Sequence, residues 1–216
     1  MTPKQKIFFL YRKFKHFFFK RIFRFFILHK FYVNPIRKLH LGCGERLLQG
    51  WLNADIYNGD IYLDITKKLP FKSNSIDLVY SHHVIEHITL AQFKDLIAEL
   101  YRVMKPGAWA HIVTPDLKKI VHVYSRPEEH EDLIEYYCKD DSLIGPAHYV
   151  NVAMRQEQEH LYIYDFTLLQ TLFQNVGFRE MVSCEYGESR VDELKGIDDH
   201  GYKMIDKISL TIELKK

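Results

Sequence analysis

The chain has 216 residues, of which 47 % are hydrophobic and 27 % charged, a composition typical of one globular α/β domain with a short appendage. Its three cysteines, Cys43, Cys138 and Cys184, form no C-x-x-C pair, which argues against a disulfide scaffold and favours a reducing, cytoplasmic compartment. The net charge of +2 is distributed unevenly. Residues 1–33 carry nine Lys or Arg and no acid, whereas residues 34–216 carry 21 Lys or Arg against 28 Asp or Glu. We therefore expect a basic arm followed by an acidic domain.

The arm, residues 1–33, holds ten of the fifteen phenylalanines. Lysines and arginines interrupt its apolar stretches, so it has neither the roughly 18 uncharged apolar residues of a spanning helix nor the unbroken apolar region of a signal peptide. Its apolar residues nevertheless recur at helical spacing, which predicts a helix that lies on an anionic membrane surface. The alternatives are a helix that packs on the domain or on another subunit, and an arm that contacts nucleic acid.

The domain opens after Asn34-Pro35 with short apolar runs that end in glycine or in a polar residue, a pattern typical of strands. We expect strands over residues 37–41, 50–55, 60–64, 76–80 and 108–114, with a helix over 90–104 before the last of them. Beyond these, we expect helical or irregular structure over 116–160, a helix over 166–175, a strand over 178–186, a long loop over 187–206 and a strand over 207–214. Strands that alternate with helices or short turns predict a parallel sheet covered on both faces.

Each of the first four strands ends in glycine or in a polar group. These are Gly42 and Gly44 after the first strand, Asp55 and Asp64 at the ends of the second and third, and Ser81-His82 at the end of the fourth. Glycine lets backbone N–H groups approach a ligand closely, and an acid at the end of the next strand can accept hydrogen bonds from ribose hydroxyls. Because the carboxyl ends of parallel strands meet at one edge, we expect a nucleoside-containing ligand there.

Several motifs resemble those of class I S-adenosylmethionine-dependent methyltransferases, specifically the small type associated with cell-surface polysaccharide biosynthesis. They are L-H-L-G-C-G over 39–44, G-W-L-N-A-D over 50–55, D-I-T-K-K-L-P-F over 64–71, S-H-H-V-I-E-H-I over 81–88 and E-L-Y-R-V-M-K-P-G over 99–107. The resemblance covers residues 37–214. It implies a doubly wound, seven-stranded Rossmann-like α/β sheet with the last two strands antiparallel, and S-adenosyl-L-methionine as the cofactor.

The resemblance also implies which residues contact the cofactor. These are Gly42, Cys43 and Gly44 around the methionine part, Asp55 on the ribose, Asp64 and Ile65 beside the adenine, and Ser81 and His82 beside the sulfonium. Two positions depart from the family pattern. His40 stands where an acid is usual, and Arg46 stands where a third glycine is usual.

Transfer of a methyl group to a hydroxyl requires loss of the hydroxyl proton, which histidine can accept near neutral pH. We take His82 and His83 as the catalytic candidates, followed by His148 and His160 from the segment before the last helix. We expect this segment, with Arg155, to recognise the methyl acceptor.

Residues 83–87 also spell H-x-x-E-H, the inverted zinc-protease motif. No third ligand is evident on a distinct helix, so the sequence predicts no metal site. The alternative is a divalent ion at Glu86 or His87 that anchors the acceptor.

The sequence as a whole predicts methyl transfer to an oxygen of a sugar or glycolipid in surface polysaccharide biosynthesis, at the inner membrane face. RNA or protein methylation is the first alternative, although no N-P-P-Y motif follows the fourth strand and we do not expect a nucleic-acid partner. A non-catalytic, cofactor-binding scaffold at the membrane is the second. A nicotinamide-binding domain is disfavoured because Leu47 stands where the third glycine of G-x-G-x-x-G belongs.

Overall fold

The computed structural model describes residues 26–139, 144–199 and 203–216. Most of the predicted arm, residues 1–25, lies outside the described part. Among the described residues, no helix is both long enough and apolar enough to cross a membrane. All three cysteines are free thiols.

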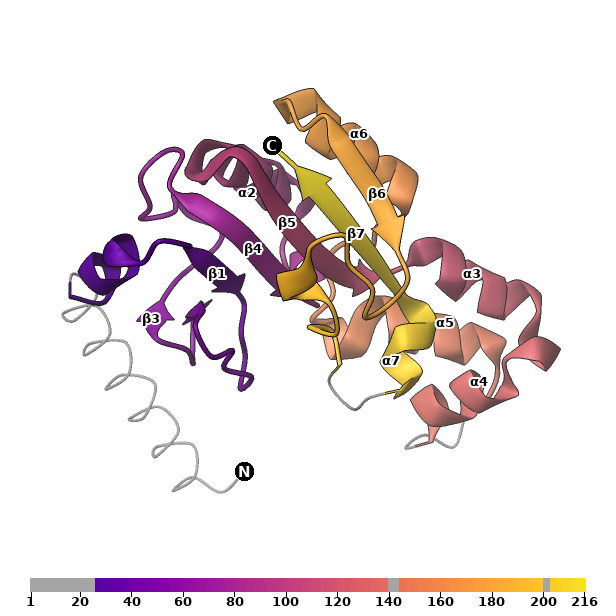
Figure 1. Ribbon diagram of the computed structural model, residues 1–216. Coiled ribbons are helices and arrows are strands. Elements are labelled where there is room, and N and C mark those ends of the chain that lie inside the picture. The colour runs from indigo at the N-terminus through magenta and orange to yellow at the C-terminus, as the bar shows by residue number, and fades with distance from the viewer. Residues whose placement is uncertain (1–25, 140–143, 200–202) are drawn as a thin grey trace, which may run out of the picture.

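Seven strands form one mixed sheet at the centre of the described chain (Figure 1). They are β1 (Lys38–Leu41), β2 (Leu52–Asp55), β3 (Ile61–Tyr62), β4 (Ile76–His82), β5 (Met104–Pro115), β6 (Glu180–Cys184) and β7 (Ser209–Lys215). Their order is β3-β2-β1-β4-β5-β7-β6. The first five strands are mutually parallel, and β7 runs antiparallel to both of its neighbours. The predicted fold class is therefore confirmed.

Two amphipathic helices, α2 (Leu90–Val103) and α6 (Phe166–Val176), cover one face of the sheet (Figure 1). Side chains cap both helices at their first turn. Thr89 and Gln92 form a capping box at the start of α2, which satisfies two backbone N–H groups. Asp165 accepts a hydrogen bond from the backbone of Leu168, and α6 ends at Gly177, where φ is +118°.

A helical lobe lies beyond the carboxyl end of β5 (Figure 1). It consists of α3 (Leu117–Ser125), η2 (Pro127–Glu129), α4 (Glu131–Cys138), α5 (Pro146–Arg155) and η3 (Gln156–Gln158). The lobe has an apolar cluster of its own, in which Ile120, Leu133 and Tyr149 are buried. The expectation of helical or irregular structure over 116–160 is confirmed, and this segment forms a separate layer next to the sheet edge.

The opposite face of the sheet is covered mainly by a loop. Residues 42–75, all of which the structure describes, contain no α-helix, so β1, β2 and β3 are joined by turns alone. Instead, Leu194 and Ile197 from the segment after β6 pack on Leu78 and Tyr80 of β4. The prediction of a long loop over 187–206 holds in part, because the described residues are mostly irregular but include η4 (Asp192–Leu194) and the start of α7 (Lys203–Ile208).

Residues 26–33, at the end of the arm, form a helix that packs on the domain. Phe31 is only 5 % exposed and lies against Phe71, with the ring centroids 5.8 Å apart. The Tyr32 hydroxyl accepts a hydrogen bond from the backbone of Lys72. For this part of the arm, the structure shows the packing alternative.

Candidate active site

The order in which the chain adds strands to the sheet reverses between β1 and β4, which are parallel neighbours. From β1 the chain moves outward to β2 and β3, and it then returns to β4 on the other side of β1. Leu41 pairs with Ala54 of β2 and also with Ser81 of β4, so the residues that follow these three lie level at one edge. Open α/β sheets bind their ligands at such a switch point. The structure thus brings Gly42, Asp55 and His82 together, as predicted.

Asp55 is held by three backbone N–H groups. Oδ2 accepts a hydrogen bond from Gly44 at 3.1 Å, and Oδ1 accepts from Tyr57 at 2.6 Å and from Asn58 at 3.2 Å. An ionised carboxylate has about four acceptor sites, so one remains on Oδ2 for a ribose hydroxyl. The half-buried carboxylate is therefore oriented before any ligand binds.

The two glycines of the turn after β1 differ in the space around them, since Gly44 has free space where a Cβ would lie and Gly42 has none. Gly44 has φ of +54°, and a Cβ there would meet no described atom within 4 Å. Gly42 has φ of +64°, but a Cβ there would lie 2.3 Å from Cγ2 of Val84. Cys43 between them is buried, so only its backbone can face a ligand. The backbone beside Gly44 is therefore open, whereas Val84 narrows the space beside Gly42. The predicted contacts of Gly42, Cys43 and Gly44 with the methionine part, and of Asp55 with the ribose, stay predictions.

The two departures from the family pattern have structural roles. His40 is buried, with Nδ1 at 3.1 Å from Asn53 Oδ1 and its ring 4.9 Å from that of Tyr80. Arg46 donates hydrogen bonds to the Ile197 carbonyl oxygen and to the Tyr80 hydroxyl. Arg46 therefore ties the turn after β1 to the loop that covers the sheet.

Three further predicted residues at the same edge are buried or partly buried, namely Asp64, Ile65 and Ser81. Asp64 Oδ1 accepts hydrogen bonds from the backbone and hydroxyl of Thr66, while Ile65 packs on the main core. Ser81 is 2 % exposed. Their cofactor contacts stay predictions.

Ile56 was not singled out from the sequence. It directly follows Asp55 and is 44 % exposed, so its apolar side chain is available to pack on an adenine ring. An apolar residue immediately after the strand-terminal acid is the signal that could have found it.

His82 and His83 are adjacent at the end of β4, with ring centroids 4.7 Å apart. His82 Nε2 lies 3.4 Å from the Tyr186 hydroxyl. His83 is held at both ring nitrogens, because Nε2 lies 2.9 Å from Ser209 Oγ and Nδ1 lies 3.0 Å from Glu86 Oε1. With φ of +53°, His83 is outside any helix, so the zinc-protease arrangement of H-x-x-E-H does not form.

Glu86 is a fully buried acid at this edge. Burial alone would raise its pKa, but the contact with His83 outweighs that effect and lowers the pKa below its ordinary value. The second carboxylate oxygen accepts a hydrogen bond from the Thr114 hydroxyl near the end of β5. Glu86 thus joins the ends of β4 and β5.

The remaining predicted residues come from the helical lobe. His160 follows η3 and lies beside His87, with ring centroids 5.0 Å apart. His148 and Arg155 are on α5. Of these candidates, the structure brings His160 to Glu86, a contact that no pattern in the sequence predicts.

Residues 58–112, from before β3 into β5, match the family model described as a methyltransferase domain. No curated protein matches the chain.

Among solved structures, a SAM-dependent methyltransferase from Archaeoglobus fulgidus is 16 % identical, with 92 % of this chain and 93 % of that chain covered and a TM-score of 0.49. A methyltransferase from Mesorhizobium loti is also 16 % identical, covering 86 % and 93 %, with a TM-score of 0.48. Phosphoethanolamine N-methyltransferase 2 from Haemonchus contortus is 14 % identical, covering 89 % and 51 %, with a TM-score of 0.48.

The strand order defines a Rossmann-like α/β fold with a switch-point site, and the matched segment indicates a methyltransferase enzyme that uses S-adenosyl-L-methionine.

Proposed function

We propose that the enzyme methylates a hydroxyl oxygen of a sugar or glycolipid during assembly of a surface polysaccharide. The observation that carries this proposal is the pair His82 and His83 at the end of β4, with Glu86 behind His83. A hydroxyl acceptor has to lose a proton during the reaction, and imidazole accepts protons near neutral pH. The sugar itself rests on the sequence resemblance and on the basic arm.

When bound, S-adenosylmethionine supplies an electrophilic methyl group on a sulfonium sulfur. Transfer would replace the sulfur–carbon bond by a bond from the acceptor oxygen to the methyl carbon, and the electron pair of the broken bond would stay on sulfur. His82 or His83 takes the hydroxyl proton. Ser209 and Glu86 fix the His83 ring, so the two histidines keep their orientation beside the acceptor. Alignment of this kind contributes up to about 7–11 kcal/mol in favourable cases.

We further propose that the arm, residues 1–33, holds the enzyme on the cytoplasmic face of an anionic membrane, where glycolipid acceptors are found. It carries nine basic residues. Each contributes about 1 kcal/mol near an anionic leaflet, so three engaged residues supply about 3 kcal/mol. Cosedimentation of the full chain with phosphatidylglycerol vesicles, but not with phosphatidylcholine vesicles, is the expected result. Equal recovery with both would contradict a membrane role.

The acceptor class is tested with the purified full chain and methyl-labelled S-adenosylmethionine. Lipid-linked sugars, nucleotide-linked sugars, total RNA and a protein extract are offered separately, with Asp55→Ala as the cofactor-site control. We expect label in a sugar fraction, lost in the variant. Label in RNA or protein would overturn the sugar proposal, and cofactor binding without transfer to any fraction would favour a scaffold.

A further inference from the structure

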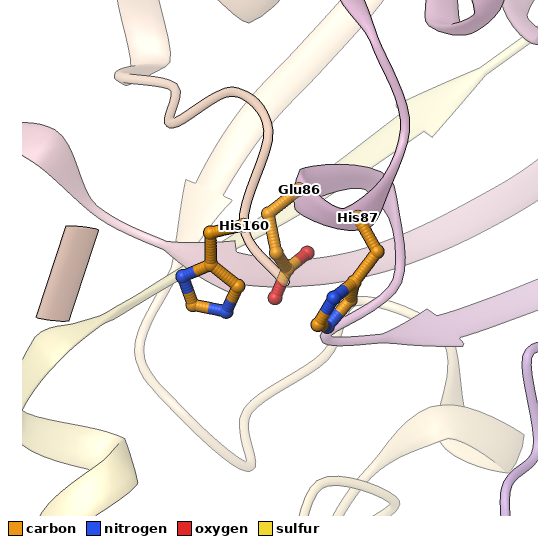
Figure 2. Close-up of side chains that lie close together, drawn as sticks. All are labelled: Glu86, His87 and His160. Atoms are coloured by element: carbon orange, nitrogen blue, oxygen red, sulfur yellow. The ribbon is translucent and has the colours of Figure 1, made fainter. Parts of the chain in front are cut away.

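Glu86, His87 and His160 form a cluster at the carboxyl edge of the sheet. Glu86 and His87 belong to η1 (Ile85–His87), and His160 comes from the turn that follows η3. Figure 2 shows the Glu86 carboxylate between the two imidazole rings. One ligand atom from each residue lies within 4.8 Å of the other two. Residues 74 positions apart in the chain thus present a carboxylate and two imidazoles to one point.

One buried atom of the cluster, Nε2 of His160, has no hydrogen-bond partner among the described residues. Oε1 of Glu86 is also buried, and its close polar neighbour is His83 Nδ1 at 3.0 Å. Burying an ionised carboxylate is costly unless a cation or several hydrogen-bond donors compensate it. The cluster therefore has the acceptor atoms that a cation requires.

The two imidazoles are oriented as metal ligands usually are. His87 Nδ1 lies 3.2 Å from the Glu159 carbonyl oxygen, and His160 Nδ1 lies 3.1 Å from the Ala153 carbonyl oxygen. A carbonyl oxygen can only accept, so each Nδ1 carries the hydrogen and each Nε2 keeps its lone pair. Hydrogen bonds of this kind from the second ring nitrogen hold most metal-binding histidines in position.

The segment that carries His160 is fixed to η1 by the backbone. The N–H groups of Leu161 and Tyr162 both donate to the Glu86 carbonyl oxygen, at 2.7 and 3.2 Å. The Thr114 hydroxyl donates to Glu86 Oε2 at 3.2 Å. The three side chains are therefore held by contacts from η1, β5 and the helical lobe.

We propose that Glu86, His87 and His160 bind a divalent transition-metal ion, zinc in the first place. Two histidines and one carboxylate are a ligand set found in catalytic zinc sites, which keep a further position open. Tetrahedral zinc with Zn–N bonds of about 2.0–2.1 Å requires ligand atoms about 3.3 Å apart. Small side-chain rotations therefore have to shorten the distances between the ligand atoms by up to about 1.5 Å.

The position of the site indicates a role for the ion. Glu86 contacts His83 after β4 and Thr114 near the end of β5, so the ion lies next to the proposed acceptor position. An acceptor hydroxyl in the open position would lose its proton more readily, because a bound metal lowers the pKa of oxygen ligands. This role rests on the proposed function, whereas metal binding itself does not.

A second cluster supplies a matched control. His122, Glu129 and His130 also present three ligand atoms within 4.8 Å. However, the side chains of His122 and Glu129 are 54 % and 48 % exposed, and neither residue is tied to the sheet edge. Removal of this cluster should leave the proposed site intact.

The test uses the full chain, freed of metal with a chelator and titrated with Co²⁺, whose visible absorption reports tetrahedral coordination, and then with Zn²⁺. We expect one equivalent of Co²⁺, displaced by Zn²⁺, with thermal stability increased by Zn²⁺. His160→Ala and His87→Gln should each weaken binding more than about 100-fold, since even outer-shell changes cost 10–100-fold. The double variant His122→Ala/His130→Ala should bind as the wild type does.

Absence of Co²⁺ and Zn²⁺ binding by the folded chain would overturn the proposal. So would binding that the His122/His130 variant loses and the His87 variant retains. His87→Gln guards against a folding defect in His160→Ala, because the His87 hydrogen bond is exposed whereas Nε2 of His160 is buried, and circular dichroism checks both. Asp55→Ala should keep the metal while losing S-adenosylhomocysteine, so failure of the metal site and failure of the cofactor site are distinguishable.

Discussion

The backbone N–H of Gly44 donates a hydrogen bond to Asp55 Oδ2 across 3.1 Å. This contact joins the turn after β1 to the end of β2. No helix lies between these two strands in the chain. The turn and the acid therefore form one unit at the switch point. A ligand that binds the carboxylate also meets the open backbone beside Gly44.

Asp55→Asn should weaken cofactor binding by about 10–100-fold, because hydrogen bonds to a charged acceptor are worth about 1.5–3 kcal/mol. The amide keeps the shape of the carboxylate but has one acceptor oxygen for several donors. Calorimetric titration of the full chain with S-adenosylhomocysteine measures the effect. Asp95→Asn, on the exposed side of α2, is the control and should bind normally. Equal affinities in the two variants would exclude Asp55 from the cofactor site.

Two glycine substitutions should separate folding from binding. Gly42→Ala places a Cβ 2.3 Å from Val84 and should destabilise the fold by more than the roughly 1–2 kcal/mol that a left-handed backbone conformation costs. Gly44→Ala meets no described atom and should cost only that amount, but it should weaken cofactor binding. Urea unfolding and calorimetry of both variants give the comparison. The pair Gly42→Ala/Val84→Ala should recover part of the lost stability, and no recovery would contradict the steric explanation.

His82→Ala and His83→Ala should each lower the rate of methyl transfer by about 10²–10⁴-fold if the residue is the general base. Affinity for S-adenosylhomocysteine should change little in the His83 variant, because His83 lies on the acceptor side. The measurement is the label-transfer rate with the acceptor found above, with His122→Ala in the helical lobe as the control. A base role is excluded for either histidine whose removal leaves the rate unchanged.

His111 should make the fold less stable at alkaline pH. It is fully buried on β5, with Nε2 at 2.9 Å from Asp198 Oδ2 and Nδ1 at 3.0 Å from Glu213 Oε1. Burial alone would lower the pKa of His111, but the hydrogen bonds to the two acids raise it to about 9. The stabilisation is fully present below pH 6.5, the ordinary pKa of histidine, and is lost as the pH rises to about 9. Unfolding free energy should fall by roughly 3 kcal/mol over this interval.

Urea unfolding followed by circular dichroism at pH 6 and pH 9 measures this dependence. His111→Gln should be less stable than the wild type at pH 6 and should show a flatter dependence between the two values. His122→Gln, an exposed histidine on α3, should keep the slope of the wild type. A wild-type slope in His111→Gln would assign the pH dependence to other groups.

Phe31→Ala should destabilise the fold by about 3 kcal/mol, the lower end of the range for a buried phenylalanine. The residue packs on Phe71 in the main core. Phe26→Ala, in the same helix at a position that is 67 % exposed, should change stability by less than about 0.5 kcal/mol. Equal effects of the two substitutions, measured by urea unfolding, would show that residues 26–33 do not contribute to the core.

Features with a local signal could be predicted from the sequence. Glycines and acids at the ends of short apolar runs indicated the strand ends that meet at the switch point, and helical spacing predicted a helix over 166–175, close to the limits of α6. These predictions succeed because strand alternation, helix periodicity and helix caps depend on residues only a few positions apart. The boundaries shifted by a few residues, as for β5, which begins at Met104 instead of residue 108.

By itself, then, the amino-acid sequence determined the fold class and the strand ends that meet at the switch point, and it predicted the cofactor class. Only the tertiary structure decided that His160 lies beside Glu86, that Asp198 pairs with His111, and that Phe31 belongs to the core. The partners in these contacts are 40 to 87 positions apart in the chain. No local periodicity records such contacts, because they depend on how the helical lobe, the covering loop and the end of the arm pack on the finished sheet.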